Sequence, residues 1–257
     1  MTKQAAESLS LEQARALLPE AEAWITGLLD RLKPLLPARR LRVLDIGSAQ
    51  GRGLIVLERL GHDACGVEPW DAAREASSRF AAEQGASVEV RAGRAEALPY
   101  EDDGFDLVLA MSVMEHVEDL EASLREIHRV IRPGGIFWFN SASSLSIQQN
   151  EIARFPLFGW YPDRVKRQIM LWAKREYPHL IGHTDAPAMH WWTPRKAHES
   201  LEAAGFERVW DRWELRTEAE TSPRARPLLR LAKRNRAARF VGDVLVEGAA
   251  FAARKAS

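Results

Sequence analysis

The sequence predicts an α/β fold with a doubly wound, mostly parallel sheet. Short apolar runs alternate with helical patterns through residues 41–140, and the links between them are short. The run Phe105–Ala110 is apolar in the way that is typical of a strand buried on both faces. Because successive parallel strands need a crossover, this alternation indicates a parallel sheet with right-handed connections.

The elements of the alternating region follow from local signals. Ser10 is a candidate N-cap for a helix that Pro34 and Pro37 close, and the Pro133-Gly134-Gly135 turn stops another helix. Strands are expected at residues 41–46, 64–68, 87–91, 105–110 and 136–140. Helices are expected at 10–36, from the glycine-rich turn to residue 60, at 70–84 and at 120–131.

The pattern changes after Asn140. Residues 141–192 begin as a Ser-rich loop and carry many Trp and Tyr residues, which indicates an insertion. A helix from Thr193 through Ala204 and a strand at 206–215 follow, then a basic helical segment at 223–246. Residues 248–254 fit a final strand or a helix. We expect one domain, 1–257, divided into an N-terminal helical segment (1–40), a core (41–140), the insertion (141–192) and a C-terminal part (193–257).

Composition narrows the class of protein. The chain of 257 residues has 46% hydrophobic residues and equal numbers of basic and acidic ones, so its total charge predicts no polyanionic partner. The single cysteine, Cys65, excludes an internal disulfide and a Cys-rich metal site. No apolar run is long enough for a secretory signal or a spanning helix, which predicts a cytoplasmic protein.

A glycine-rich turn follows the first strand of the core. Gly47–Gly53 lies between a strand and a helix, as in nucleotide-binding folds, but its spacing fails the G-x-G-x-x-G pattern because Arg52 takes the third glycine's place. Asp45 stands at the strand end, where a carboxylate favours a cationic ligand over a phosphate. Glu68 ends the second strand, where an acid can accept hydrogen bonds from ribose hydroxyls.

Four motifs in order make residues 41–140 resemble the class I S-adenosylmethionine-dependent methyltransferases, in particular those acting on small molecules and lipids. They are VLDIGSAQGRG (43–53), GVEP (66–69), AEALPYEDDGFDLVLAMSVMEHVED (95–119) and LREIHRVIRPGGIFWFN (124–140). The resemblance implies a seven-stranded Rossmann-like methyltransferase fold, S-adenosyl-L-methionine as cofactor, and helical insertions after strand five and between the last two strands.

The resemblance also implies residue roles. Eleven residues are expected to bind the cofactor. They lie near its methionine part, its ribose hydroxyls, its adenine and its methyl group, and they are Asp45, Gly47, Ser48, Ala49, Gly51, Glu68, Pro69, Arg94, Ala95, Ala110 and Met111. Two positions depart from the family pattern. Ala49 replaces the commonest middle glycine, and Arg94 replaces an Asp that accepts a hydrogen bond from adenine, which an arginine does not do.

Candidate catalytic residues are His116, just past the fourth strand, and His190 in the insertion, with His183 and Asp185 as further candidates for a base. A capping role for His116 is the alternative, and His128 is expected to be structural. No metal-ligand spacing occurs, so no metal is expected.

The predicted function is methyl transfer to a small-molecule or lipid-like acceptor, with O-methylation favoured. The insertion's aromatic side chains suit such an acceptor, although they also suit a small core of their own. Residues 224–246 fit either a basic amphipathic helix on the inner membrane surface or a solvated helix, and nucleic acid is disfavoured. Modification of RNA or protein, a non-catalytic cofactor-binding subunit, and a nicotinamide oxidoreductase are the alternatives.

Overall fold

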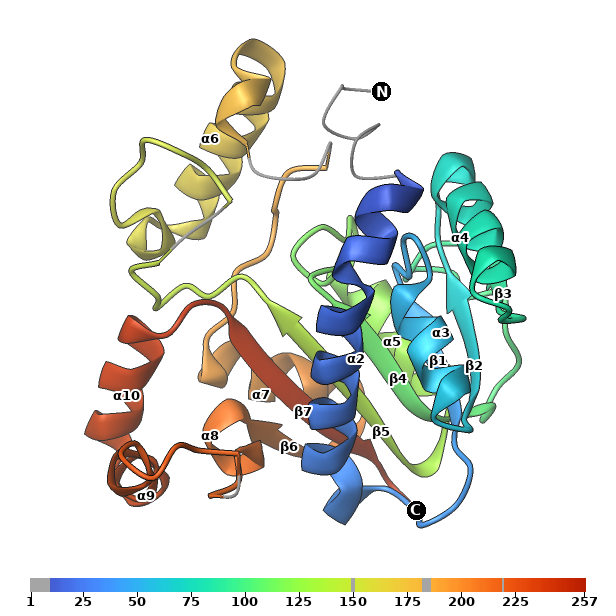
Figure 1. The fold of residues 1–257 in the computed structure, drawn as a ribbon. Helices are drawn as coiled ribbons and strands as arrows, with labels where there is room; N and C mark the ends of the chain where they lie inside the picture. Colours follow the sequence, from blue (N-terminus) through green and yellow to red (C-terminus); the bar gives the residue numbers. More distant parts are fainter. Residues whose placement is uncertain (1–9, 149–150, 182–185, 219) are drawn as a thin grey trace.

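The computed structural model describes residues 10–148, 151–181, 186–218 and 220–257. Within them, one seven-stranded sheet has the order β3-β2-β1-β4-β5-β7-β6 (Figure 1). Strands β1 to β5 pair in parallel, and β7 pairs antiparallel with both β5 and β6. The strands are β1 Arg42–Ile46, β2 Asp63–Val67, β3 Glu89–Arg91, β4 Phe105–Met111, β5 Ile131–Ser141, β6 Phe206–Asp211 and β7 Ala249–Lys255. The predicted fold class is confirmed, and residues 248–254 are resolved in favour of a strand.

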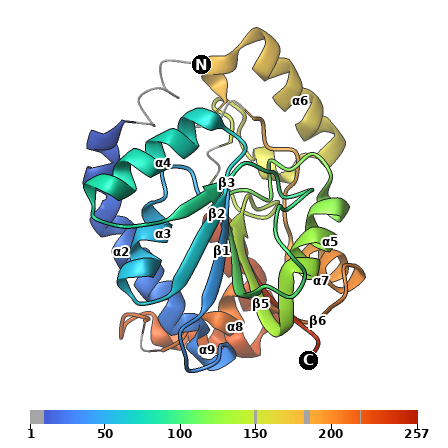
Figure 2. The same ribbon diagram turned by 90° about the vertical axis from the view of Figure 1, so that its right-hand side faces the viewer.

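Helices cover both faces of this sheet, and Figure 2 shows α2, α3 and α4 on one side with α5 and α7 on the other. The helices are α2 Leu11–Leu32, α3 Arg52–Arg59, α4 Asp71–Glu83, α5 Leu120–Val130, α6 Asp163–Glu176, α7 Pro194–Ala203, α8 Arg212–Leu215, α9 Arg226–Arg234 and α10 Arg236–Leu245, with short 3-10 turns η1 Lys33–Leu35, η2 Phe158–Trp160 and η3 Pro178–Leu180. Ser10 caps α2 by accepting a hydrogen bond from the backbone of Gln13, as predicted.

Two hydrophobic cores follow from the alternation of side chains along the strands. Trp138 of β5 belongs to the core under α2 and α3, whereas its neighbours Phe137 and Phe139 belong to the core under α5 and α7. Both cores lie below the carboxyl ends of the parallel strands, so polar side chains that follow those ends gather along one edge of the sheet.

Three predicted boundaries were wrong, each for a local reason. β5 begins at Ile131, because Ile131 pairs with Phe105 and the Pro-Gly-Gly turn is absorbed as an irregularity inside the strand. β6 ends at Asp211, whose carboxylate forms a capping box with Glu214 and starts α8. The basic segment is two helices, because Asn235 interrupts it and caps α10.

The insertion has a hydrophobic core of its own, formed by Phe158, Met170, Trp191 and neighbouring side chains. Trp192 instead packs in the main core, and Trp160 and Trp172 are exposed. Figures 1 and 2 show α6 beyond the carboxyl ends of the strands. The buried aromatic residues therefore hold the insertion together and attach it to the sheet. None of the helices in the described part combines the length and apolarity needed to cross a bilayer.

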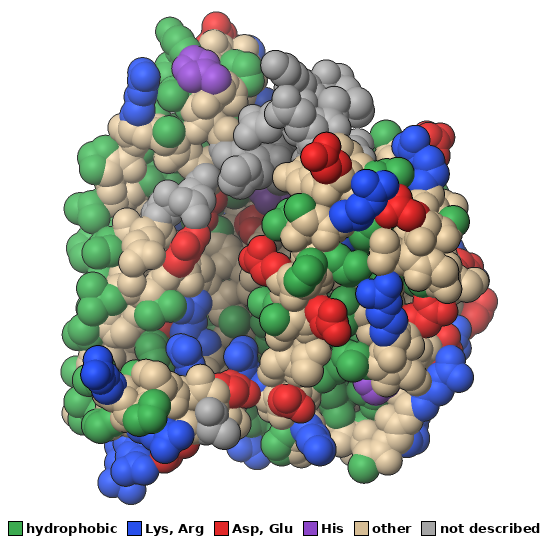
Figure 3. Space-filling model, viewed as in Figure 1, with side chains coloured by type: hydrophobic (Ala, Val, Ile, Leu, Met, Phe, Trp, Pro, Cys, Tyr) green, Lys and Arg blue, Asp and Glu red, His purple; other side chains and the backbone are tan. Residues whose placement is uncertain are grey.

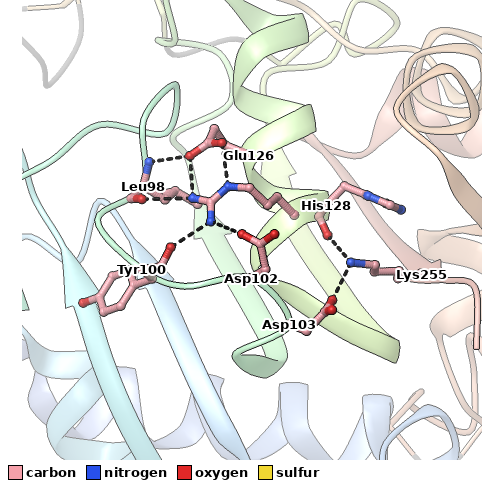
Figure 4. A network of polar contacts seen from close by, with 8 residues as sticks. Leu98, Tyr100, Asp102, Asp103, Glu126, His128 and Lys255 are labelled. Carbon is pink, nitrogen blue, oxygen red and sulfur yellow. Dashed lines mark hydrogen bonds and ion pairs between the residues drawn. The ribbon is translucent and has the colours of Figure 1, made fainter.

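Arg129 of α5 fixes the loop that precedes β4 (Figure 4). Its guanidinium donates to the carbonyls of Leu98 and Tyr100 at 3.1 and 2.9 Å and pairs with Asp102 and Glu126 at 2.6 and 2.8 Å. Glu126 in turn accepts from the backbone of Leu98 at 2.9 Å. One side chain thus organises a loop that has no regular secondary structure.

Replacing Arg129 with alanine is expected to lower the free energy of unfolding by about 2–3 kcal/mol, because several charge-assisted hydrogen bonds lose their donor together. Arg125→Ala on the same helix is the matched control, since Arg125 is exposed and makes one pair with Glu121. It is expected to cost less than about 0.5 kcal/mol. Urea denaturation checks both values, and equal values for the two variants would contradict this assignment.

Candidate active site

The glycine-rich turn between β1 and α3 has three residues in the left-handed conformation. Gly47 and Gly51 both have a φ of 70°, and Ala49 has a φ of 46°, so all three occupy the left-handed region. A Cβ atom on Gly47 would lie 2.5 Å from Val113, which leaves no room for a side chain there. The N–H of Gly47 donates to the carbonyl of Val67 at 2.8 Å, which holds the turn against the end of β2.

Two buried acids flank this turn. Glu68 follows β2, and its two carboxylate oxygens accept one hydrogen bond each, from the N–H of Ala49 at 3.0 Å and the N–H of Trp70 at 3.2 Å. Asp45 of β1 is 1% exposed, and its Oδ1 is buried without a hydrogen-bond partner among the described residues. Burial, followed by the charge of Glu68, raises the pKa of Asp45 to about 7.

Other predicted cofactor residues gather around the same turn. A Cβ atom on Gly53 would lie 3.4 Å from the Oδ2 of Asp45 and 3.5 Å from the Cε of Met111, so both side chains meet at the start of α3. Ala110, which precedes Met111 on β4, is fully buried. Ser48 is buried in the turn, and Pro69 is exposed just after Glu68.

The two positions beside the expected adenine site behave differently from each other. Ala95 is buried in the main core. Arg94 is half-exposed and pairs with Glu118 at 2.7 Å, so its side chain is engaged with the segment that leads into α5. Glu96 accepts hydrogen bonds from the backbone of Glu118 and Asp119 at 2.7 and 3.4 Å. Arg94 and Glu96 therefore tie residues 94–97 to the start of α5.

A cavity of about 530 Å³ lies at the carboxyl ends of β4 and β5 and the start of β7. Figure 3 shows a hollow on this face, with acidic side chains around its upper part and basic ones around its lower part. The lining residues come from the sheet edge, α2, the insertion and the C-terminal part; they are Trp24, Arg31, Ser112, Glu115, His116, Trp138, Asn140, Ser141, Ala142, Glu151, Met170, Ile181, Ala186, Ala188, Arg212, Glu247, Gly248, Ala249 and Ala250.

Glu115 and His116 give this cavity two groups able to take a proton near neutral pH. Glu115 is 7% exposed and accepts a hydrogen bond from the Oγ of Ser141 at 2.6 Å. Burial raises the pKa of Glu115 to about 7, and burial lowers the pKa of His116, which keeps its imidazole neutral at pH 7. Glu115 Oε1 and His116 Nε2 are 4.0 Å apart.

The two candidate catalytic histidines lie on neighbouring stretches of backbone, because the N–H of His190 donates to the carbonyl of Glu115 at 3.1 Å. His116 lines the cavity, whereas His190 is buried outside its lining, with Nε2 at 3.0 Å from the carbonyl of Val117. Burial lowers the pKa of His190. The further candidates His183 and Asp185 lie outside the described residues. Within the described part, no group of three or more His, Cys, Asp or Glu residues is arranged to hold a metal ion.

Sequence reasoning did not single out Glu115, although it stands beside His116 in the polar stretch that follows β4. That adjacency was the available signal. It also missed Trp24 and Arg212, which reach the cavity from α2 and from the end of β6. Their parts of the chain carry no motif, and only the packing of distant elements brings them to the cavity.

Comparison with known proteins agrees with this geometry. Residues 44–139 match the family model described as a methyltransferase domain. This segment holds most of β1, the glycine-rich turn, Glu68, β4 and most of β5. This part of the chain is similar to a methyltransferase domain.

Relatives and solved structures extend the comparison. A ubiquinone biosynthesis O-methyltransferase of Azorhizobium caulinodans is 38% identical over 104 residues, which are 40% of this chain and 41% of that protein. The chain therefore aligns with about two fifths of the length of the curated relatives it matches. An S-adenosylmethionine-dependent methyltransferase structure from Mesorhizobium loti has a TM-score of 0.56 at 17% identity, covering 87% of this chain and 95% of its own.

The fold by itself does not decide the reaction. The crystal structure of a cyclase superposes with a TM-score of 0.55 at 20% identity, covering 91% of this chain and 80% of its own. The reaction therefore depends on the side chains at the site.

S-adenosylmethionine is the cofactor of this domain family, and the residues around the turn fit it. Asp45 is a buried carboxyl group with one unpartnered oxygen, which is the environment that a ligand ammonium group or sulfonium would compensate. Each oxygen of Glu68 keeps acceptor capacity after its single backbone hydrogen bond. The close approach of Val113 to Gly47 shows that the turn admits no larger residue there.

Proposed function

We propose that this protein is an S-adenosylmethionine-dependent methyltransferase that methylates a hydroxyl group of a small-molecule or lipid-like acceptor bound in the cavity. The observation that carries the proposal is the position of the cavity. It begins at Ser112, next to Met111 at the cofactor turn, and holds two groups able to accept a proton, Glu115 and His116.

The cofactor supplies an activated methyl group on its sulfonium, and the remaining work belongs to this chain's residues. We assign Asp45, Gly47, Ser48, Ala49 and Gly51 to the methionine part, Glu68 to the ribose hydroxyls, Pro69 and Ala95 to the adenine, and Ala110 and Met111 to the boundary with the acceptor. We place Arg94 beside the adenine without a direct hydrogen bond to it, because its guanidinium pairs with Glu118.

The acceptor hydroxyl has to lose its proton as it is methylated. Glu115 and neutral His116 line the cavity and follow Val113, whose side chain lies against Gly47 of the turn. A group whose pKa is near the working pH is the most effective base, and the pKa of Glu115 is raised to about 7. Ser141 orients the Glu115 carboxylate through its 2.6 Å hydrogen bond. Trp24 and Trp138 close one side with rings 5.3 Å apart and help to exclude water.

The relatives support an oxygen acceptor. The matching proteins from Azorhizobium caulinodans and Rhizobium rhizogenes are both described as ubiquinone biosynthesis O-methyltransferases. The family-model match at residues 44–139 contains most of the cofactor motifs and Glu115–His116. Most of the cavity lining comes from outside residues 44–139, so the family-model match covers little of the acceptor site.

Incubation of the purified protein with S-adenosylmethionine carrying a radiolabelled methyl group tests the proposal. Label is expected in a small-metabolite or lipid extract and absent from RNA and protein fractions. Label confined to RNA or protein would contradict the acceptor class, and tight cofactor binding without any transfer would favour a non-catalytic subunit. Boiled protein supplies the control.

We further propose that the basic C-terminal helices contact an anionic membrane surface. Helices α9 and α10 expose large apolar side chains, with Leu228 68% exposed and Phe240 53% exposed. Between and beside them lie basic residues, of which Arg230 and Arg239 are engaged in ion pairs with Glu218 and Asp211. Apolar side chains bordered by positive charge are typical of helices that lie in the membrane interface.

Vesicle flotation checks this contact. The wild type is expected to float with vesicles rich in phosphatidylserine or phosphatidylglycerol. It is expected not to float when the vesicles contain only phosphatidylcholine. A Leu228→Ser, Phe240→Ser double variant is expected to lose about 10-fold or more of its vesicle affinity, because each apolar group is worth roughly 1–2 kcal/mol when buried. Leu60→Ser, at an exposed leucine that ends α3, is the control. Equal loss in the control would contradict the assignment.

A further inference from the structure

Asn140 is the last residue of β5 that pairs with β4, and its side chain lines the acceptor cavity. Its Oδ1 accepts a hydrogen bond from the backbone N–H of Ser112 at 3.1 Å. We propose that the Nδ2 amide of Asn140 donates a hydrogen bond to the acceptor oxygen and stabilises the negative charge that this oxygen gains as its proton leaves. This inference rests on the proposed function and adds a residue that acts on the acceptor.

The orientation of the Asn140 amide follows from this hydrogen bond. A backbone N–H needs an acceptor, so the oxygen of the amide faces Ser112 and the NH₂ group lies on the other side. Among the described residues, no atom accepts a hydrogen bond from this NH₂ group. Because Asn140 lines the cavity, its two N–H bonds are available to a ligand there.

Asn140 lies at the boundary between the proposed cofactor site and the cavity. It pairs with Met111 of β4, which packs with the core under α2 and α3, as does Trp138 two positions before Asn140. Because side chains alternate along a strand, Asn140 lies on the same face of the sheet. Asp45 reaches this face as well, since its Oδ2 and the Cε of Met111 both approach the start of α3. An amide between Met111 and the cavity meets an oxygen that approaches the methyl group.

The proposed proton acceptor is held by the next residue of the same strand. Ser141 donates from its Oγ to Glu115 Oε2 at 2.6 Å, and Glu115 and Asn140 both line the cavity. The acceptor oxygen forms a bond to the methyl carbon, the carbon–sulfur bond breaks with its electron pair remaining on sulfur, and the hydroxyl proton goes to Glu115. A fixed donor aimed at an oxygen that gains charge is among the strongest contributions a site can make.

A purely structural role for Asn140 is the alternative. Ser112 has a φ of 52°, in the left-handed region that a residue with a Cβ atom seldom adopts. Its N–H has two acceptors on Asn140, the carbonyl oxygen and Oδ1, both at 3.1 Å. The side chain of Asn140 therefore also helps to hold this turn. Ser112→Gly relieves the strain without any side-chain acceptor, so it separates the two roles by experiment.

The phenol 4-nitrophenol tests the inference without turnover, because its single hydroxyl becomes coloured when it ionises. Its apparent pKa is measured by absorbance when it is bound with S-adenosylhomocysteine to the wild type, Asn140→Ala and Asn140→Asp. The alanine variant lacks the donor, and the aspartate variant places a carboxylate oxygen where the NH₂ group was. The pKa is expected to be lowest in the wild type, higher by about 1 in Asn140→Ala and higher again in Asn140→Asp, because a hydrogen bond to the charged oxygen is lost and then replaced by repulsion.

Methyl transfer to the same probe, measured as kcat/KM, gives the second readout. Asn140→Ala is expected to lose about 100-fold while its affinity for S-adenosylhomocysteine stays within about threefold. The double variant Ser112→Gly, Asn140→Ala should be equally slow, because Ser112→Gly restores the turn and not the donor. Recovery of the wild-type kcat/KM in the double variant, or the same pKa in all three proteins, would overturn the inference. If Asn140→Ala does not fold, the pKa in the isosteric Asn140→Asp decides.

The inference and the proposed function fail differently in this experiment. The expected order of pKa values without any methyl transfer would retain the contact between Asn140 and the oxygen and remove the proposed function. Methyl transfer that Asn140→Ala leaves unchanged would retain the proposed function and remove the inference. A wild type that leaves the titration of 4-nitrophenol unchanged would also overturn the inference.

Discussion

Replacing Glu115 with glutamine is expected to lower kcat by about 100-fold or more while the affinity for S-adenosylhomocysteine stays within about twofold. The carboxylate lies in the acceptor cavity, is oriented by Ser141, and has a pKa raised to about 7 by burial. An acceptor hydroxyl would lose its proton to this group or, through it, to His116. The amide keeps the shape of the side chain but accepts no proton.

The pH dependence gives this prediction a second test. The activity of the wild type is expected to rise with pH through about 7, because the carboxylate is the form that accepts a proton. The Glu115→Gln variant should lose that limb of the profile. Glu118→Gln, at an exposed glutamate three residues further along, is the control and is expected to keep at least half of the activity. Unchanged kcat in Glu115→Gln would remove Glu115 from the proposed chemistry.

The Asp45→Asn variant is expected to bind S-adenosylmethionine about 10- to 100-fold more weakly than the wild type at pH 8, because a buried carboxylate loses its charge. Ligand affinity of the wild type should rise as the pH increases through about 7, since only the ionised Asp45 attracts a cation. The variant should show no such rise. Calorimetric titration at pH 6, 7 and 8 checks both statements.

Stability without ligand should change in the opposite direction. The pKa of Asp45 is higher in the folded protein than in the unfolded chain, so the wild type becomes less stable as the pH rises from about 4 through about 7. Asp45→Asn lacks this loss and is expected to have the higher Tm at pH 8. A lower Tm for the variant at pH 8 would show that Asp45 has a protein partner that stabilises its charge.

Much of the fold was predictable because its signals are local. Ser10, Thr193 and the glycine-rich turn each act within a few residues, and the structure confirms the elements that they begin or end. The boundaries that were wrong depend on pairing at a distance. Ile131 joins β5 only because Phe105 lies opposite it, and Asp211 ends β6 because its side chain caps the next turn.

The candidate site divides in the same way. Asp45, Glu68 and the turn follow strand ends, so their clustering at one edge of the sheet follows from the topology. The acceptor side does not follow from the sequence. Trp24, Glu115 and Arg212 are brought to one cavity by a helix, a loop and a strand that are far apart in the chain, and His190 is equally polar yet lies outside the lining.

Calorimetric titration of the wild type tests most directly whether the turn between β1 and α3 binds S-adenosylmethionine. S-adenosylmethionine and S-adenosylhomocysteine are expected to bind one per chain with micromolar Kd, and NAD at the same concentrations is expected to give no heat of binding. Binding of NAD without binding of either adenosyl compound would contradict the assignment of this turn to S-adenosylmethionine.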